Sequence, residues 1–236
     1  MPGSTIKNNM RKLITLAVAL MISSICFAQK DVTKFLGIPV DGTKSAMIQK
    51  LKDKGFTYNE KEDCLKGEFN GRDVDLFIRT NKRKVYRIAV IDANASDETN
   101  IKIRYNNLLQ QFKRNDNYTE NGINPEIPED EDISYEMAVN NKRYEASFYQ
   151  RSYKMDDSLA LFEYISNEMK ERYSSDKIDS MNENEKNSAI TSILWDYHLY
   201  ILPKKHVWFT FGNYYGKYYM VIYYDNENNE ADGEDL

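Results

Sequence analysis

Histidine is scarce in this chain, and the sequence motifs that build common active sites are missing. The only histidines are His198 and His206, and no cysteine or carboxylate stands at zinc-ligand spacing from them, so we expect no metal site. No glycine-rich phosphate loop, Gly-x-Ser-x-Gly or His-Glu-x-x-His sequence occurs. The sequence therefore gives no signal for catalysis, and we expect neither a catalytic residue nor a cofactor.

Long apolar runs are also missing. The longest, residues 13–21, follows the short basic stretch Arg11-Lys12 and is too short to span a bilayer and remain as an anchor. This pattern predicts a secretory signal peptide over residues 1–28, with translation starting at Met10 and cleavage before Gln29. A buried N-terminal helix is the alternative. We expect a periplasmic or secreted protein of a Gram-negative bacterium, without a transmembrane anchor after cleavage.

Cysteine is limited to Cys26 and Cys64. Ile25 precedes Cys26 where a lipoprotein would carry a small residue, which argues against a lipid anchor. After cleavage Cys64 is the only cysteine, so no disulfide forms within the chain and stability must come from packing. We expect Cys64 on an outer strand face beside Glu62 and Asp63, where acidic neighbours would raise its pKa and leave an inert thiol.

Basic blocks are missing from a chain whose formal charge is −5. An acidic chain of this kind argues against nucleic acid as a partner. The acidic runs at 126–132 and 225–235 are interpreted as solvated segments. In residues 225–229, side chains that could supply oxygen ligands alternate as they do in a calcium-binding loop. Glu230, however, stands where such a loop requires glycine.

What the sequence does contain is a meander signal over residues 65–92. Asn70-Gly71 is a strong hairpin signal, because a type I′ turn needs positive φ at both central residues. A two-residue loop there pairs Phe69 with Arg72 and places the apolar residues of both strands on one face. The other face is charged, so we interpret the meander as scaffold.

The second turn of the meander is set by the same argument. Pairing Ile78 with Tyr86 keeps the apolar residues of the next strand on the buried face. A slip by one residue would place Arg87 in the core, so we reject it.

Further elements follow from apolar periodicity. A period of three to four residues predicts a first helix that begins after the N-cap Thr43. The same period predicts three further helices, over 98–114, 158–173 and 185–201. Alternation predicts a hairpin of 133–139 with 144–148 and a last hairpin of 206–211 with 217–224.

These elements define an α+β fold of antiparallel meanders and hairpins with helices packed on one face, in two loosely similar halves. The expected parts are a helix–meander–helix module (30–118), an acidic linker (119–132), a second hairpin and helix module (133–225) and an acidic tail (226–236). The helix–meander–helix order across about 43–115 resembles the small modules of the β-lactamase-inhibitor-protein-like group.

The whole chain also resembles a family of exported proteins from Gram-negative gut anaerobes. The pieces that carry this resemblance are Phe35-Leu36-Gly37-Ile38-Pro39-Val40 and the Gly-Glu-Asp-Leu ending. The resemblance implies an envelope location and no activity.

The last hairpin is the strongest candidate for a binding surface, because aromatic residues crowd both faces of both strands. Two interpretations are open: a central hairpin buried on both sides, or one with a face left open for recognition. Tyrosine and tryptophan combine large contact area with a polar tip, which suits interfaces. The candidate partner-binding residues are Trp208, Tyr214, Tyr215 and Tyr218.

The leading functional hypothesis is an exported, non-catalytic binding or inhibitor-like module that docks an envelope protein on an open sheet face. A glycan partner is an alternative, since aromatic rings also stack on sugars. A second hypothesis is an envelope hydrolase without a standard motif, which a pocket of carboxylates or a histidine of perturbed pKa would favour. A third is an outer-membrane assembly or structural factor.

Overall fold

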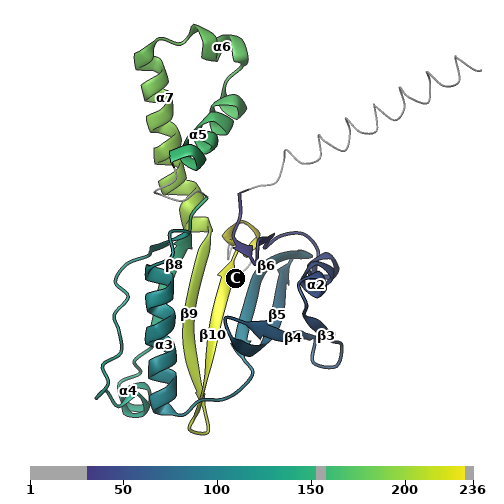
Figure 1. Cartoon of the computed structure of the whole chain (residues 1–236), viewed down its shortest axis with the longest axis vertical. Coiled ribbons are helices and arrows are strands. Elements are labelled where there is room, and N and C mark those ends of the chain that lie inside the picture. The colour runs from purple at the N-terminus through teal and green to yellow at the C-terminus, as the bar shows by residue number, and fades with distance from the viewer. Residues whose placement is uncertain (1–30, 153–157, 232–236) are drawn as a thin grey trace, which may run out of the picture. The chain divides into compact units, whose positions relative to one another are not determined.

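The computed structural model describes residues 31–152 and 158–231, and the predicted signal peptide lies outside them. The fold is α+β, as expected (Figure 1). Eight antiparallel strands form one sheet in the order β3-β4-β5-β6-β10-β9-β8-β7, and a separate short hairpin joins β1 (Lys34–Phe35) to β2 (Ile38–Pro39).

The first half of the sheet is a helix followed by a four-stranded meander. Its elements are α2 (Lys44–Asp53), β3 (Thr57–Asn59), β4 (Cys64–Phe69), β5 (Arg72–Asn81) and β6 (Lys84–Asp92). Thr43 caps α2, because its side chain accepts a hydrogen bond from the Ala46 amide. Phe69 pairs with Arg72 around a turn in which Asn70 and Gly71 both have positive φ, so the predicted hairpin is confirmed.

The second turn differs from the prediction by two residues. Ile78 pairs with Ile88 rather than with Tyr86. Asn81 pairs with Lys84 at the turn, which moves the register by one residue from the prediction, and the shift between Arg79 and Thr80 moves it by one more. A β-bulge adds a residue to one strand and so moves the pairing without turning the strand over. The side chain of Arg87 therefore stays out of the core, as the prediction required.

The second half also has a helix followed by four strands, with a short helix inserted after its first strand and a longer helical segment inserted before its third. Its elements are α3 (Glu98–Lys113), β7 (Tyr118–Glu120), α4 (Ile133–Val139), β8 (Glu145–Gln150), β9 (His206–Tyr214) and β10 (Lys217–Asp225). Each half is thus a helix followed by four antiparallel strands, and the two last strands, β6 and β10, pair at the centre of the sheet. The halves are similar in element order, as the sequence predicted.

The prediction of a strand over residues 133–139 is wrong, because this segment forms the helix α4. The Asp132 side chain accepts a hydrogen bond from the Tyr135 amide and caps the helix. Ile133 is buried and Met137 packs against the core, and their spacing of four residues suits one helix face as well as strand alternation. In so short a run, periodicity alone does not distinguish the two.

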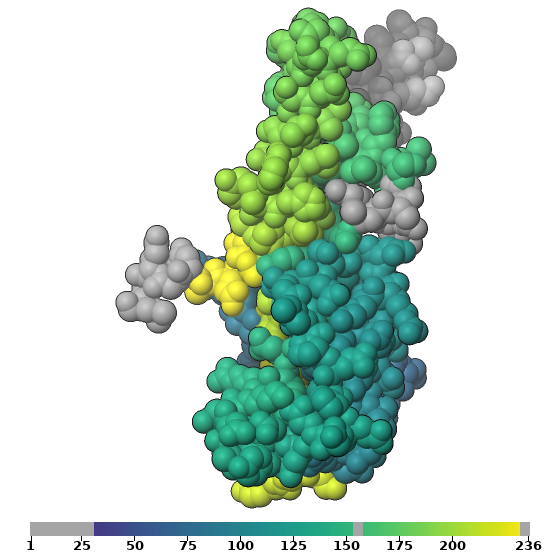
Figure 2. Space-filling view, turned by 90° about the vertical axis from the view of Figure 1, so that its left-hand side faces the viewer, coloured from purple at the N-terminus to yellow at the C-terminus, as the bar shows by residue number. Residues whose placement is uncertain are grey.

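The predicted acidic linker 119–132 begins inside β7 and then packs along α3. The Asn106 side chain donates to the Ile127 carbonyl and accepts from the Ile127 amide at 2.8 and 2.9 Å, and Ile127 is buried. Figure 2 shows α3, this segment and α4 as one continuous surface on that side of the molecule.

Residues 158–204 form a helical arm inserted between β8 and β9. It contains α5 (Ser158–Arg172), α6 (Ser175–Ser180), α7 (Glu183–Asp196), the π-helical turn η2 (Tyr197–Ile201) and the 3-10 turn η3 (Leu202–Lys204). The predicted helices at 158–173 and 185–201 are confirmed. The arm has small apolar clusters of its own, around Ile193 and around Tyr197.

One apolar core fills the face of the sheet that α2 and α3 cover. It runs from Met47 and Leu51 of α2, over β5 and β6, to Tyr105 and Phe112 of α3, which pack on Phe209. Because this core is continuous across both halves, the two halves are not separate folding units.

Candidate functional site

The two faces of the sheet differ sharply in how they are covered. Along β10, alternate residues point to opposite faces. Tyr218, Met220, Ile222 and Tyr224 point to the helices and are buried, whereas Tyr219, Val221 and Tyr223 point away and are partly exposed. We call the first side the inner face and the second side the open face. The last hairpin is therefore not buried on both sides, because one of its faces is partly exposed.

Apolar side chains collect at the centre of the open face. The strand register places Phe77 opposite Ala89, Ala89 opposite Tyr223, and Tyr223 opposite Trp208. Ile91 and Val221 form a neighbouring pair. We call this set the apolar patch; its members are Phe77, Ala89, Ile91, Trp208, Val221 and Tyr223. The patch crosses β5, β6, β10 and β9, so it combines strands from both halves of the chain.

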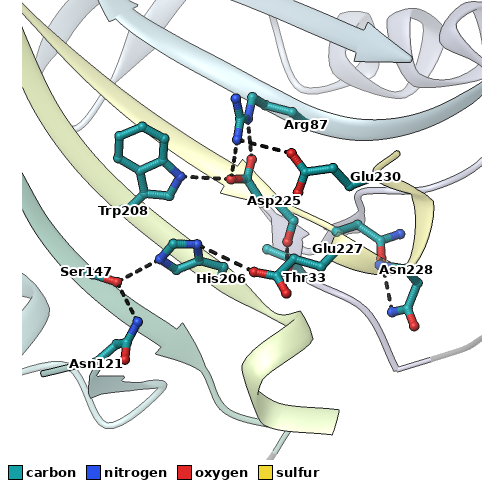
Figure 3. A network of polar contacts seen from close by, with 11 residues as sticks. Thr33, Arg87, Asn121, Ser147, His206, Trp208, Asp225, Glu227, Asn228 and Glu230 are labelled. Atoms are coloured by element: carbon teal, nitrogen blue, oxygen red, sulfur yellow. Dashed lines mark hydrogen bonds and ion pairs between the residues drawn. The ribbon is translucent and has the colours of Figure 1, made fainter. Parts of the chain in front are cut away.

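An ion pair between the partly exposed Arg87 and the buried Asp225 holds one end of the patch (Figure 3). Arg87 donates from Nε and Nη2 to the two carboxylate oxygens of Asp225 at 2.6 and 2.7 Å. Trp208 Nε1 donates to the same carboxylate at 2.8 Å, and the hydrogen bond to Asp225 raises the pKa of Arg87. The Arg87 guanidinium lies 4.8 Å from the Tyr223 ring centre, and the Trp208 and Tyr223 rings stack at 4.2 Å. These contacts fix the orientation of Trp208 on the sheet.

A second polar group lies beside the patch on β8 and β9. Ser147 Oγ lies 2.7 Å from His206 Nε2, and Asn121 Nδ2 donates to Ser147 Oγ at 3.0 Å (Figure 3). The other imidazole nitrogen, Nδ1, lies 3.7 Å from Glu227 Oε1. Burial lowers the pKa of His206 below its usual 6.5, so the imidazole is neutral at physiological pH. Burial also raises the pKa of Glu227.

The four predicted binding residues fall in three different places. Trp208 lies on the open face. Tyr214 and Tyr215 are exposed at the tip of the β9–β10 hairpin, beyond the patch. Tyr218 points to the inner face, is only 1% exposed and has its hydroxyl 2.5 Å from Ser134 Oγ, so it is not part of an accessible surface.

The other residues considered for chemistry have structural explanations. Cys64 is buried, and burial together with the nearby Asp75 raises its pKa, as expected for an inert thiol. His198 is exposed on the π-helical turn, whereas His206 lies at the start of β9. Within the described ranges, no three histidine, cysteine or acidic side chains are grouped as metal ligands.

Sequence reasoning missed Arg87, Asp225 and Ser147. Arg87 and Asp225 meet only because β6 pairs with β10, although 138 residues separate them. The one available signal was the apolar character of both faces of β10, which indicated a central strand but not its neighbour.

None of the helices in the described part of the chain has the length and apolar character needed to cross a bilayer. Comparison with known proteins gives no matching family model, no matching curated protein and no matching solved structure.

Proposed function

We propose that this chain is an exported binding or inhibitor-like module of the bacterial envelope, and that a protein partner docks on its open face. The apolar patch is the observation that carries the proposal. Tryptophan, tyrosine and arginine are the residues that dominate binding energy at protein interfaces, and here they meet on one rigid surface. Export is expected from the basic and apolar pattern of the N-terminal sequence.

The orientation of the rings favours a protein partner over a glycan. Sugars stack on the free face of an aromatic ring. Tyr223 stacks on Trp208 at 4.2 Å, and the His206 ring lies nearly parallel to the Trp208 ring at 6.2 Å. The stack with Tyr223 occupies one face of the Trp208 ring, which leaves less free ring face for a sugar. At the usual strand spacing, four strands present a surface about 14 Å wide, which suits contact with a protein surface.

Capture from an envelope extract of the source bacterium tests this proposal. Val221→Lys places a charge in the middle of the apolar patch, where the side chain already contacts water. Ile103→Lys is the matched control, because Ile103 is 53% exposed on α3 in the helical layer. We expect the unaltered chain and Ile103→Lys to retain the same partner and Val221→Lys to lose it. Equal capture by all three proteins, or capture that depends on glycan, would contradict docking of a protein on the open face.

A further inference from the structure

Three residues of the open face have the arrangement of a nucleophile, a general base and an orienting carboxylate. Ser147 lies on β8, His206 on β9 and Glu227 just after β10, so three chain segments bring them together. Ser147 faces Nε2 of the imidazole at 2.7 Å, and Glu227 faces Nδ1 at 3.7 Å. Recognition of such a triad rests on geometry and roles rather than on order in the sequence.

The hydrogen-bond directions point the Ser147 hydroxyl hydrogen at His206 Nε2, which is the atom that would accept it. Ser147 Oγ accepts a hydrogen bond from Asn121 Nδ2, so its own hydrogen is left to point at His206 Nε2. The neutral imidazole then carries its proton on Nδ1. This tautomer is favoured, because a bare Nδ1 lone pair facing the Glu227 carboxylate would be repelled.

The charges around His206 suit a base that is neutral at rest and charged only during the reaction. The side chain is 23% exposed, and its burial keeps the imidazole neutral. Three carboxylates lie near it, Asp225, Glu145 and Glu227, and Arg87 opposes them. An imidazolium formed during proton transfer would be stabilised by this excess of negative charge.

We propose that Ser147 is a serine nucleophile activated by His206, and that the open face hydrolyses esters carrying a flat apolar group. This activity goes beyond the binding role of the patch. The Tyr149 and Trp208 rings, whose centres lie 5.9 and 6.2 Å from that of His206, supply apolar surface for such a group beside the base.

The reaction is balanced with water as the only second reactant. Ser147 Oγ bonds to the ester carbonyl carbon while its proton passes to His206 Nε2, and the carbonyl electron pair moves to the oxygen. The Asn121 amide, which lies 3.0 Å from Ser147 Oγ, would donate a hydrogen bond to that oxyanion. Collapse breaks the ester C–O bond, and His206 gives the proton to the leaving alcohol. Water, deprotonated by His206, then releases the acid and restores Ser147.

Labelling of the full chain with a fluorophosphonate probe, located by mass spectrometry, tests the nucleophile. We expect stoichiometric labelling at Ser147, with a rate that falls as the pH drops through the lowered pKa of His206. His206→Gln should slow labelling about 100-fold or more, the usual contribution of a general base. Ser134→Ala is the matched control, because the Ser134 hydroxyl is hydrogen-bonded to Glu98 at 2.7 Å and has no imidazole partner.

Two further measurements keep the proposal open to refutation. Ser147→Ala should abolish the hydrolysis of a naphthyl ester while leaving the melting temperature close to that of the unaltered chain. Ser147→Cys should react with iodoacetamide at pH 6 much faster than Cys64, because His206 would hold the new thiol as a thiolate. No labelling at Ser147, unchanged ester hydrolysis in Ser147→Ala, or a cysteine at position 147 no faster than Cys64 would overturn the proposal.

Discussion

At the scale of single residues, Asp225 organises the open face. Its carboxylate is buried and accepts hydrogen bonds from Arg87 and from Trp208 Nε1. A buried ion pair of this kind contributes little net stability, but removing one partner leaves the other charge uncompensated. The pair therefore fixes the direction of Trp208 and Arg87 more than it stabilises the fold.

We expect Asp225→Ala to lower the free energy of unfolding by about 3 kcal/mol, since Arg87 would lose its buried partner. Chemical denaturation followed by tryptophan fluorescence measures this loss. Lys44→Ala is the control, because it removes the exposed ion pair of Lys44 with Asp63 and should cost much less. Equal losses in the two variants would contradict the organising role of Asp225.

Tyr215 is held in an unfavourable backbone conformation at the tip of the β9–β10 hairpin. Its φ is 51°, and Gly216 follows with a φ of 73°, which together form the kind of turn that Asn-Gly suits best. Because Tyr215 is 89% exposed, its ring gains little from packing. We expect Tyr215→Asn to raise the free energy of unfolding by about 0.5–1 kcal/mol, measured by thermal or chemical denaturation. A loss of stability would show that the ring makes a contact worth more than the turn strain.

The stability of the folded chain should depend on pH through Glu227, and the raised pKa of Glu227 sets the direction of this dependence. The folded chain holds the Glu227 proton more tightly than the unfolded chain, so the ionised carboxylate weakens the fold at neutral pH. This weakening is present at pH values above the pKa of Glu227 in the folded chain, and it disappears below the ordinary glutamate pKa of 4.5. We expect Glu227→Gln to raise the melting temperature at pH 7 and to leave it almost unchanged at pH 4.

The control for this experiment is Glu68→Gln, which alters an exposed carboxylate on β4. Because this side chain is exposed, we expect its substitution to change the melting temperature little. The account of Glu227 would be contradicted by a melting-temperature difference for Glu227→Gln that does not change with pH.

At the scale of elements, the sequence predicted most of the scaffold because its signals are local. The Asn70-Gly71 turn, the Thr43 cap and the stripe of Tyr105 and Phe112 each depend on neighbouring residues, and each is confirmed. The bulge after Arg79 could not be predicted, since it moves the register by one residue and the sequence carries no local signal for it. The helix α4 was missed because seven residues contain too few periods to separate helix from strand.

Removal of the helical arm tests whether the sheet folds without it. β8 and β9 are antiparallel neighbours, with Tyr149 opposite His206, so a short loop can join them. We expect a variant with a short glycine-rich turn in place of residues 153–203 to unfold in one cooperative transition with its sheet circular dichroism retained. Loss of cooperative unfolding would show that the arm is needed for the sheet itself.

At the scale of the whole molecule, the candidate site exists only because the two halves join at β6 and β10. The apolar patch takes Phe77 and Ile91 from the first half and Trp208 and Tyr223 from the second. Sequence periodicity assigns each of these residues to a face of its own strand but does not say which strands become neighbours. Trp208 was therefore found as a candidate, whereas its partners Arg87 and Asp225 were not.

Photo-crosslinking in living cells tests the central claim most directly. A benzoyl-phenylalanine residue at Tyr219 or Val221 would lie on the open face, and one at Tyr135, which is 53% exposed on α4, would lie in the helical layer. The account predicts a crosslinked product of one discrete mass from positions 219 and 221 and none from position 135. A product from position 135 alone, or none from any position, would contradict it.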